Sequence, residues 1–459
     1  MRDTAALLKP AFAPRLQISR LTLWLGVFVF LVGVVLNLIL YIFLDSEVTL
    51  HATRLTLIGQ AADDSWNPMH MALAVLNMAT HPPLYTTVVF DYQAKFQYPL
   101  TSMLLVSPLM HLPYDPERST RILNAISWFA TVGTAVASGL ILLRSIKLNF
   151  PQGVKIRPFD ALALVGVGVA AAFTFFPLAK AFALGQIQTW IDFLFCLAVL
   201  AWLYGRKGLA GVLTAVICMI KPQLTLLVVW AALRKEWRYV WYLAIPYGVT
   251  FVISLLVYGL QDHWNYFEFL SYLSSHGETH YPNQSVNGLV NRLLHNGSNL
   301  FWLDDAFAPY NPWVHWSTLL SSTLIIAATL FWRMREHDRA PVTDFLIASL
   351  SFTVASPIAW EHHYGIMVPM FAAAIVPTLT SPRLGAWSVA ALAISYFLSS
   401  NLWSVTNELA DTPYNFLQSY LFFGALLLLC HLYRLRHVQY LDAGAPASAV
   451  GARPAPVKL

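Results

Sequence analysis

Residues 21–44 read LTLWLGVFVFLVGVVLNLILYIFL, an apolar stretch without a charged side chain. About 20 such residues cross the hydrocarbon core of a bilayer as a helix, because a helix bonds all of its backbone polar groups internally. Basic residues precede the stretch, as in a signal peptide, but it is too long for one and lacks a cleavage site of small residues. We therefore expect a retained first transmembrane helix.

The composition extends this interpretation to the whole chain. Hydrophobic residues make up 57% of the 459 positions, charged residues only 11%, and the mean hydropathy is +0.57. Soluble domains carry about 25% charged residues. Because apolar runs recur along the chain, we predict an all-α polytopic membrane protein with about 11–13 membrane segments. The three cysteines form no CxxC pair and no basic stripe with interleaved aromatics occurs, which argues against a zinc site, a disulfide framework and nucleic-acid binding.

Lysine and arginine residues near the ends of the apolar runs predict the orientation, because they concentrate on the cytoplasmic side. Both termini are then cytoplasmic, and the two longest polar intervals, 45–99 and 261–313, are exoplasmic. The run 100–112 is short for a crossing, so we expect it to be re-entrant or a short pass. The predicted division is a cytoplasmic segment 1–19, a transmembrane domain 20–436 and a disordered cytoplasmic tail 437–459.

The interval 45–99 contains an acidic pair, Asp63-Asp64, and ends in Lys95-Phe96-Gln97-Tyr98-Pro99. A chain that is mostly membrane helix must carry out aqueous chemistry in the few polar loops that it keeps. We therefore interpret 45–99 and 261–313 as loops that close over one active site. The alternative is that both are solvated connectors.

Every unusual polar cluster falls on the outer face in this topology. A carboxylate there could be a general base, cations such as Lys221 and Arg292 could neutralise phosphate, and amides suit sugar hydroxyls. Lys221 in an apolar run costs about 2.5–3.5 kcal/mol to insert, and Pro222 breaks the helix beside it. Plainer explanations are a snorkelling lysine, an interfacial arginine anchor, a polar pair that plugs a helix break, and amides that cap helix ends. The clusters are Asp63/Asp64, Phe96-Gln97-Tyr98-Pro99, Gln186/Gln188, Lys221-Pro222-Gln223, Asn283-Gln284-Ser285 with Arg292, and Glu361-His362-His363.

Five of these motifs occur in an order that resembles glycosyltransferase family 87, the polyprenyl-phosphate-mannose-type enzymes of the GT-C superfamily. The resemblance covers about residues 20–430. The chain departs from the family's Tyr-Pro-Pro at Leu100 and from its Gln-x-Asn at Gln188, and Asp63-Asp64 does not precede the usual hydrophobic-aromatic run. The motifs are Phe96-x-Tyr98-Pro99, Gly185-Gln-x-Gln188, Lys221-Pro222-Gln223, Asn283-Gln284-Ser285 with Arg292, and Ser356-Pro-x-x-Trp-x-His-His363.

The resemblance implies a GT-C-type fold and a membrane glycosyltransferase. The donor would be a sugar, a mannose-like hexose or a pentose, on a polyprenyl phosphate, and the acceptor a hydroxyl of a lipid or glycan at the exoplasmic face. The transfer would invert the anomeric carbon, with Asp64 or Asp63 as the general base and Glu361 or Asp262 as alternatives. A phosphate monoester leaving group needs a divalent ion less than a diphosphate does, so no metal or other cofactor is expected. The residues implied in donor-phosphate and substrate binding are Tyr98, Gln186, Gln188, Lys221, Gln223, Asn283, Gln284, Arg292, His362 and His363.

The expected location is a cell membrane, the inner membrane if the cell is bacterial. The expected partners are the donor, the acceptor and membrane lipids, without nucleic acid. Two other classes stay open: a multi-pass transporter or flippase of a lipid-linked or polar small molecule, and a non-catalytic membrane scaffold. A transporter is expected to show matched interrupted helices in two halves and polar groups at the midplane, and neither pattern is apparent in the sequence.

Overall fold

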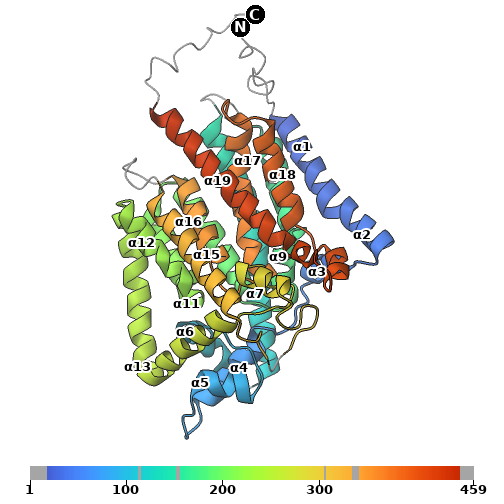
Figure 1. Cartoon of the computed structure of the whole chain (residues 1–459). Helices are drawn as coiled ribbons and strands as arrows, with labels where there is room; N and C mark the ends of the chain where they lie inside the picture. The colour runs from blue at the N-terminus through green and yellow to red at the C-terminus, as the bar shows by residue number, and fades with distance from the viewer. Residues whose placement is uncertain (1–17, 112–114, 151–155, 304–305, 333–340, 445–459) are drawn as a thin grey trace, which may run out of the picture.

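The computed structural model describes residues 18–111, 115–150, 156–303, 306–332 and 341–444, and within these ranges the chain is helical without a strand (Figure 1). The α-helices are α1 Ile18–Phe30, α2 Leu36–Leu44, α3 Val48–Ile58, α4 Trp66–Leu76, α5 Leu84–Thr86, α6 Leu100–His111, α7 Pro116–Asn149, α8 Pro158–Phe173, α9 Phe176–Ala183, α10 Gln188–Leu203, α11 Lys207–Ile220, α12 Leu226–Leu233, α13 Trp237–His276, α14 Val286–Leu293, α15 Pro312–Phe331, α16 Val342–Val354, α17 Met367–Thr380, α18 Ala386–Ser399 and α19 Tyr420–Gly444. Short π-helical segments are η2 Leu31–Val35 and η3 Thr87–Asp91, and 3₁₀ segments are η4 Pro222–Thr225, η5 Glu361–Ile366, η6 Ser404–Leu409 and η7 Asn415–Ser419.

Several of these helices have the length and apolar character of membrane spans. In the described ranges six segments qualify: Ile18–Leu44, Pro116–Asn149, Trp237–His276, Pro312–Phe331, Glu361–Thr380 and Asn415–Asp442. The pair α8 and α9, bent by 61°, is a seventh candidate, and six shorter apolar helices accompany them. The prediction of an all-α polytopic membrane protein is confirmed. The 11–13 segments predicted from apolar runs include these shorter helices.

The helices divide the molecule into a bundle and a cap. Helix α1 begins and α19 ends at one end of the bundle, whereas α4 and α5 lie at the opposite end (Figure 1). Helix α13 breaks at Gly259, whose φ of 80° is not helical, and its second part turns across the bundle to pack against α5. The polar interval 45–99 contains the helical segments α3, α4, α5 and η3, and its α3 packs against α9.

The structure bears on two of the predicted segments. Helix α6 has 12 residues, about 18 Å of helix against a hydrocarbon core of about 30 Å, so the run 100–112 is too short to cross as a helix. Helix α19 continues to Gly444, so the tail predicted to be disordered from residue 437 begins as helix, because Leu435 and Val438 are one helical turn apart and both are buried. The predicted segment 1–19 lies outside the described residues up to residue 17, as does the tail from residue 445.

Small residues and stacked rings hold the bundle together. Helices α7 and α8 cross where a Cβ on Gly168 would collide with the backbone of Gly139, so glycine at both positions permits the close approach. Elsewhere the rings of Trp202 on α10 and Phe345 on α16 stack with centroids 4.9 Å apart. These contacts give the polar loops a fixed framework on which to place side chains.

Candidate functional site

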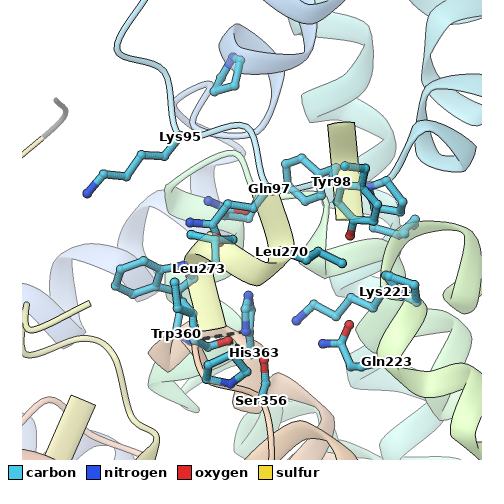
Figure 2. A pocket seen from close by; sticks show the side chains of 18 of the residues that line it. Lys95, Gln97, Tyr98, Lys221, Gln223, Leu270, Leu273, Ser356, Trp360 and His363 are labelled. Carbon is cyan, nitrogen blue, oxygen red and sulfur yellow. Dashed lines mark hydrogen bonds between the residues drawn. The ribbon is translucent and has the colours of Figure 1, made fainter. Parts of the chain in front are cut away.

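A cavity of about 1260 Å³ lies between the cap and the bundle, and Figure 2 shows part of its lining. Segments that are far apart in the sequence contribute to its walls: the Asp63 turn, residues 92–101, α9, the break after α11, the second part of α13 and the segment 355–363. Eight of the twelve predicted site residues line this one cavity: Asp63, Asp64, Tyr98, Gln186, Lys221, Gln223, His362 and His363.

The acidic pair lies between α3 and α4, and its backbone is held against the turn that follows α9. Three backbone amides, those of Ala62, Asp64 and Ser65, donate to the carbonyl oxygens of residues 183, 184 and 185 at 2.9, 2.9 and 3.3 Å. Gly185 has a φ of +69°, and a Cβ there would collide with the Ala62 carbonyl. A glycine is therefore required at the first position of the Gly-Gln-x-Gln motif, both for its conformation and for the close approach.

Gln186 links this turn to the Asp64 carboxylate. Its Nε2 donates to Asp64 Oδ2, while its Oε1 accepts from Ser65 Oγ at 2.7 Å and from Tyr98 Oη at 2.9 Å. Burial raises the pKa of the Tyr98 phenol, so it stays protonated and can donate. Asp63 is exposed, and within the described residues its carboxylate has no hydrogen bond. The network therefore fixes the orientation of Asp64 but not that of Asp63.

Lys221 stands at a break in the membrane helices. Helix α11 ends at Ile220, and Pro222, which has no N–H to continue the helix, starts η4. Among the described residues Lys221 has no carboxylate within 4 Å, and the buried Asp192 attracts it only at longer range. Figure 2 shows the Lys221 ammonium directed toward His363, with Gln223 beside it. An unpaired cation in a membrane cavity is suited to bind an anionic group.

The two histidines are placed by η5. The backbone N–H of Trp360 donates to Nδ1 of His363 at 3.2 Å, and the rings of His362 and His363 are perpendicular with centroids 4.7 Å apart. Because Nδ1 accepts, the neutral imidazole of His363 carries its proton on Nε2 and can donate from there.

Lys180 lines the cavity but was not among the predicted residues. Its Nζ lies 2.6 Å from Oε2 of Glu361, a fully buried carboxylate whose Oε1 accepts from the Tyr420 hydroxyl at 3.2 Å. A lysine in the apolar run 162–184 carries the same signal that drew attention to Lys221. Of the two alternative bases, Glu361 is held in this ion pair, and Asp262, which accepts from the Leu84 amide at 3.3 Å, is absent from the cavity lining.

Paired charges and aromatic rings form the loop end of the cavity. Lys95 Nζ lies 2.8 Å from Glu278 Oε2 and 3.7 Å from the ring centroid of Trp302, so it joins the two long polar intervals. Burial, followed by the nearby cations Lys180, Lys95 and Arg292, lowers the pKa of His280 to about 4, which leaves the imidazole neutral at neutral pH. Lys95, Glu278, Trp302 and His280 were not among the predicted site residues, although Lys95 lies beside the Phe-x-Tyr-Pro motif.

Four predicted residues lie outside the cavity lining. Arg292 is fully buried, and it donates to the carbonyl oxygen of Asn283 at 3.1 Å and to Ser419 Oγ at 2.6 Å. The side chains of Asn283 and Gln284 bond backbone groups in the segments 278–281, 357–359 and 418–422. Gln188 donates to Asp192 at 2.7 Å within α10. All four support the walls of the cavity from behind.

No group of three or more His, Cys, Asp or Glu side chains that could hold a metal ion occurs in the described part of the chain. No curated protein matches the chain. The sequence profile of glycosyltransferase family 87 matches residues 96–357, more than half of the chain. The match contains Tyr98, Gln186 and Lys221, and Asp64 and His363 lie outside it. The chain is therefore a multi-pass membrane protein that belongs to glycosyltransferase family 87.

Proposed function

We propose that this glycosyltransferase transfers a sugar from a polyprenyl-phosphate donor to an acceptor hydroxyl, with inversion at the anomeric carbon. The sugar would be a mannose-like hexose or a pentose. The reaction takes place at the exoplasmic face of a cell membrane, with both termini in the cytoplasm. The carrying observation is that one cavity contains a positioned carboxylate, Asp64, and an unpaired ammonium, Lys221.

Asp64 acts as the general base. Its carboxylate takes the proton of the acceptor hydroxyl while that oxygen attacks the anomeric carbon and the bond from this carbon to the phosphate oxygen breaks. The hydrogen bond from Gln186 suits an ionised carboxylate, which accepts only. Asp63 has no such support, so we assign the base to Asp64 rather than to Asp63.

Lys221 stabilises the leaving phosphate monoester as its negative charge grows. Removing one well-placed donor from an oxyanion site costs about 10²–10³ in rate, which sets the scale for this contribution. Gln223 and His363 lie beside Lys221 and can donate to the same phosphate oxygens (Figure 2). Lys180, which also lines the cavity, is held in its ion pair with Glu361. We propose that Arg292, Gln188, Asn283 and Gln284 shape the site without touching the substrate.

The polyprenyl chain has a matching wall. The cavity is apolar where membrane helices line it, with Leu226 on α12, Phe251 and Leu270 on α13, Ile326 on α15 and Phe352 on α16. An amphiphilic donor could lie with its lipid against these side chains and its phosphate at Lys221. This polarity favours a lipid-linked sugar over a soluble sugar nucleotide.

The test is transfer by purified protein in nanodiscs, from a radiolabelled mannosyl or pentosyl polyprenyl phosphate into membrane lipid extract. We expect Asp64→Asn to lose roughly 10²–10⁴-fold in rate, Lys221→Met roughly 10²-fold, and Asp63→Asn to retain most of the activity. All variants should keep the wild-type melting temperature. Equal activity of wild type and Asp64→Asn would overturn the assignment of the base. Translocation of the donor without transfer would instead support the transporter class.

A further inference from the structure

The cavity is large, and its two ends differ in chemistry. Its volume of about 1260 Å³ exceeds the roughly 300–1,000 Å³ of common small-molecule sites. Lys221 and Gln223 lie at one side, and Lys95 and Trp360 lie at the other (Figure 2). If the donor phosphate occupies the Lys221 side, the Lys95 side remains for the second substrate.

Two indole rings dominate the side that remains. The ring centroids of Trp302 and Trp360 are 5.3 Å apart with an angle of 63° between the planes, and both residues line the cavity. Trp302 keeps 40% of its surface exposed, although Lys95 covers part of it. Gln97, whose side chain has both an amide donor and an amide acceptor, also lines the cavity (Figure 2). This end therefore offers apolar ring surface together with uncharged hydrogen-bonding groups.

The charges at this end are compensated. Lys95 and Glu278 form an ion pair whose side chains are only 4% and 8% exposed, and Lys180 is paired with Glu361. The imidazole of His280 is neutral, because its pKa lies well below neutral pH. The contrast with Lys221 is direct, since no carboxylate in the described residues contacts that ammonium. The paired lysines at the loop end favour a ligand that is neutral and polar, with an apolar face.

We propose that the Trp302–Trp360 end is a carbohydrate-binding subsite that holds a pyranose ring of the acceptor, and that the acceptor is consequently a neutral glycan rather than a bare lipid alcohol. A pyranose presents a face of C–H groups that packs on an indole and a rim of hydroxyls that bond to amides. The assignment of this ring to an acceptor rests on the proposed function, whereas the binding of a sugar at this end does not.

Direct binding is measured first, by saturation-transfer NMR on wild-type protein in nanodiscs with three neutral disaccharides as probes, namely maltose, cellobiose and α-1,6-mannobiose. We expect transfer to ring C–H protons of at least one probe. The signal should disappear in Trp302→Leu and Trp360→Leu, and it should persist in Trp302→Phe, in Asp64→Asn and in the matched control Trp387→Leu. Trp387 on α18 is 84% exposed and remote from the cavity lining. Absence of signal with all three probes, or an undiminished signal in both leucine variants, overturns the proposal.

Kinetics then connect the subsite to transfer. In Trp302→Leu and Trp360→Leu we expect the KM for a glycolipid acceptor to rise roughly tenfold while the KM for the donor stays unchanged. Unchanged acceptor KM in these variants, with wild-type transfer intact, removes the acceptor assignment. If sugars bind at the tryptophans but Asp64→Asn transfers normally, the proposed base fails and the subsite stands. The two failures are therefore distinguishable.

Discussion

Gln186 donates a hydrogen bond to the carboxylate of Asp64, across 122 positions of sequence. The same amide accepts from Ser65 and Tyr98, so its orientation is determined by two donors on one side and by a carboxylate on the other. The turn after α9 thus carries a side chain whose function is to position another.

Gln186→Leu removes this donor and keeps the side-chain volume. An ionised carboxylate that loses a donated hydrogen bond becomes easier to protonate, so the acid limb of the pH–rate profile should move to higher pH. We expect the loss of kcat relative to the wild type to be largest at acidic pH and to shrink as the pH rises. Gln60→Leu, an exposed change near the same turn, is the control. A uniform loss of activity at every pH would indicate that Gln186 has only a structural role.

Gly185→Ala tests the backbone that carries the pair. Alanine at a φ of +69° is strained, and its Cβ would meet the Ala62 carbonyl, so the chain before Asp64 must move. A backbone outlier of this kind costs on the order of 1–3 kcal/mol, which a protein of this size can tolerate. We expect a folded protein with a modestly lower melting temperature and strongly reduced transfer. Gly385→Ala is the matched control, because a Cβ there meets no atom within 4 Å. Wild-type activity in Gly185→Ala would contradict the conclusion that position 185 requires a glycine.

The fold class could be predicted because bilayer thickness acts directly on the sequence. A membrane span must be apolar over about 20 residues, so the stretch 21–44 alone indicates a transmembrane helix. Lys221 could be found for the same reason, since a charge in an apolar run costs insertion energy and demands an explanation. Lys180, in the apolar run 162–184, carries this signal too.

Side-chain direction could not be predicted in this way. Arg292 and Lys221 look alike in sequence, each a cation in a polar motif. The eight-residue α14 turns Arg292 toward the carbonyl oxygens of the preceding loop, whereas the helix break turns Lys221 into the cavity. Such directions depend on contacts between distant segments, and the pairing of Lys180 with Glu361 is another instance. The local sequence pattern does not contain information about these contacts.

Arg292→Gln is therefore expected to affect stability rather than donor binding. The fully buried guanidinium bonds the Asn283 carbonyl and Ser419, and hydrogen bonds to charged groups contribute about 1.5–3 kcal/mol each. The melting temperature in detergent should fall by several degrees, and the folded fraction should keep the wild-type donor KM. Lys221→Gln is the matched comparison, with a raised donor KM at an unchanged melting temperature. A raised donor KM at an unchanged melting temperature in Arg292→Gln would instead indicate that Arg292 binds the phosphate.

The pair of Lys180 and Glu361 predicts non-additive stability. Lys180→Met leaves a fully buried carboxylate with only the Tyr420 hydroxyl, and breaking a buried ion pair in this way costs about 3–5 kcal/mol. Replacing both partners, as in Lys180→Met with Glu361→Gln, leaves no uncompensated charge and should restore much of the loss. Melting temperatures of the two single variants and the double variant measure the coupling. Additive losses would mean that the two groups act independently.

The neutral state of His280 predicts a dependence of stability on pH. Its folded-state pKa of about 4 lies below the ordinary value near 6.5, so between these values the unfolded chain binds more protons than the folded one. The associated stability is fully present above pH 6.5 and is lost as the pH falls toward 4. At pH 5 the loss amounts to on the order of 2 kcal/mol. Melting temperatures at pH 7.5 and pH 5 should therefore differ more in the wild type than in His280→Gln, whose amide does not titrate. An equal shift in both proteins would show that other groups govern the acid sensitivity.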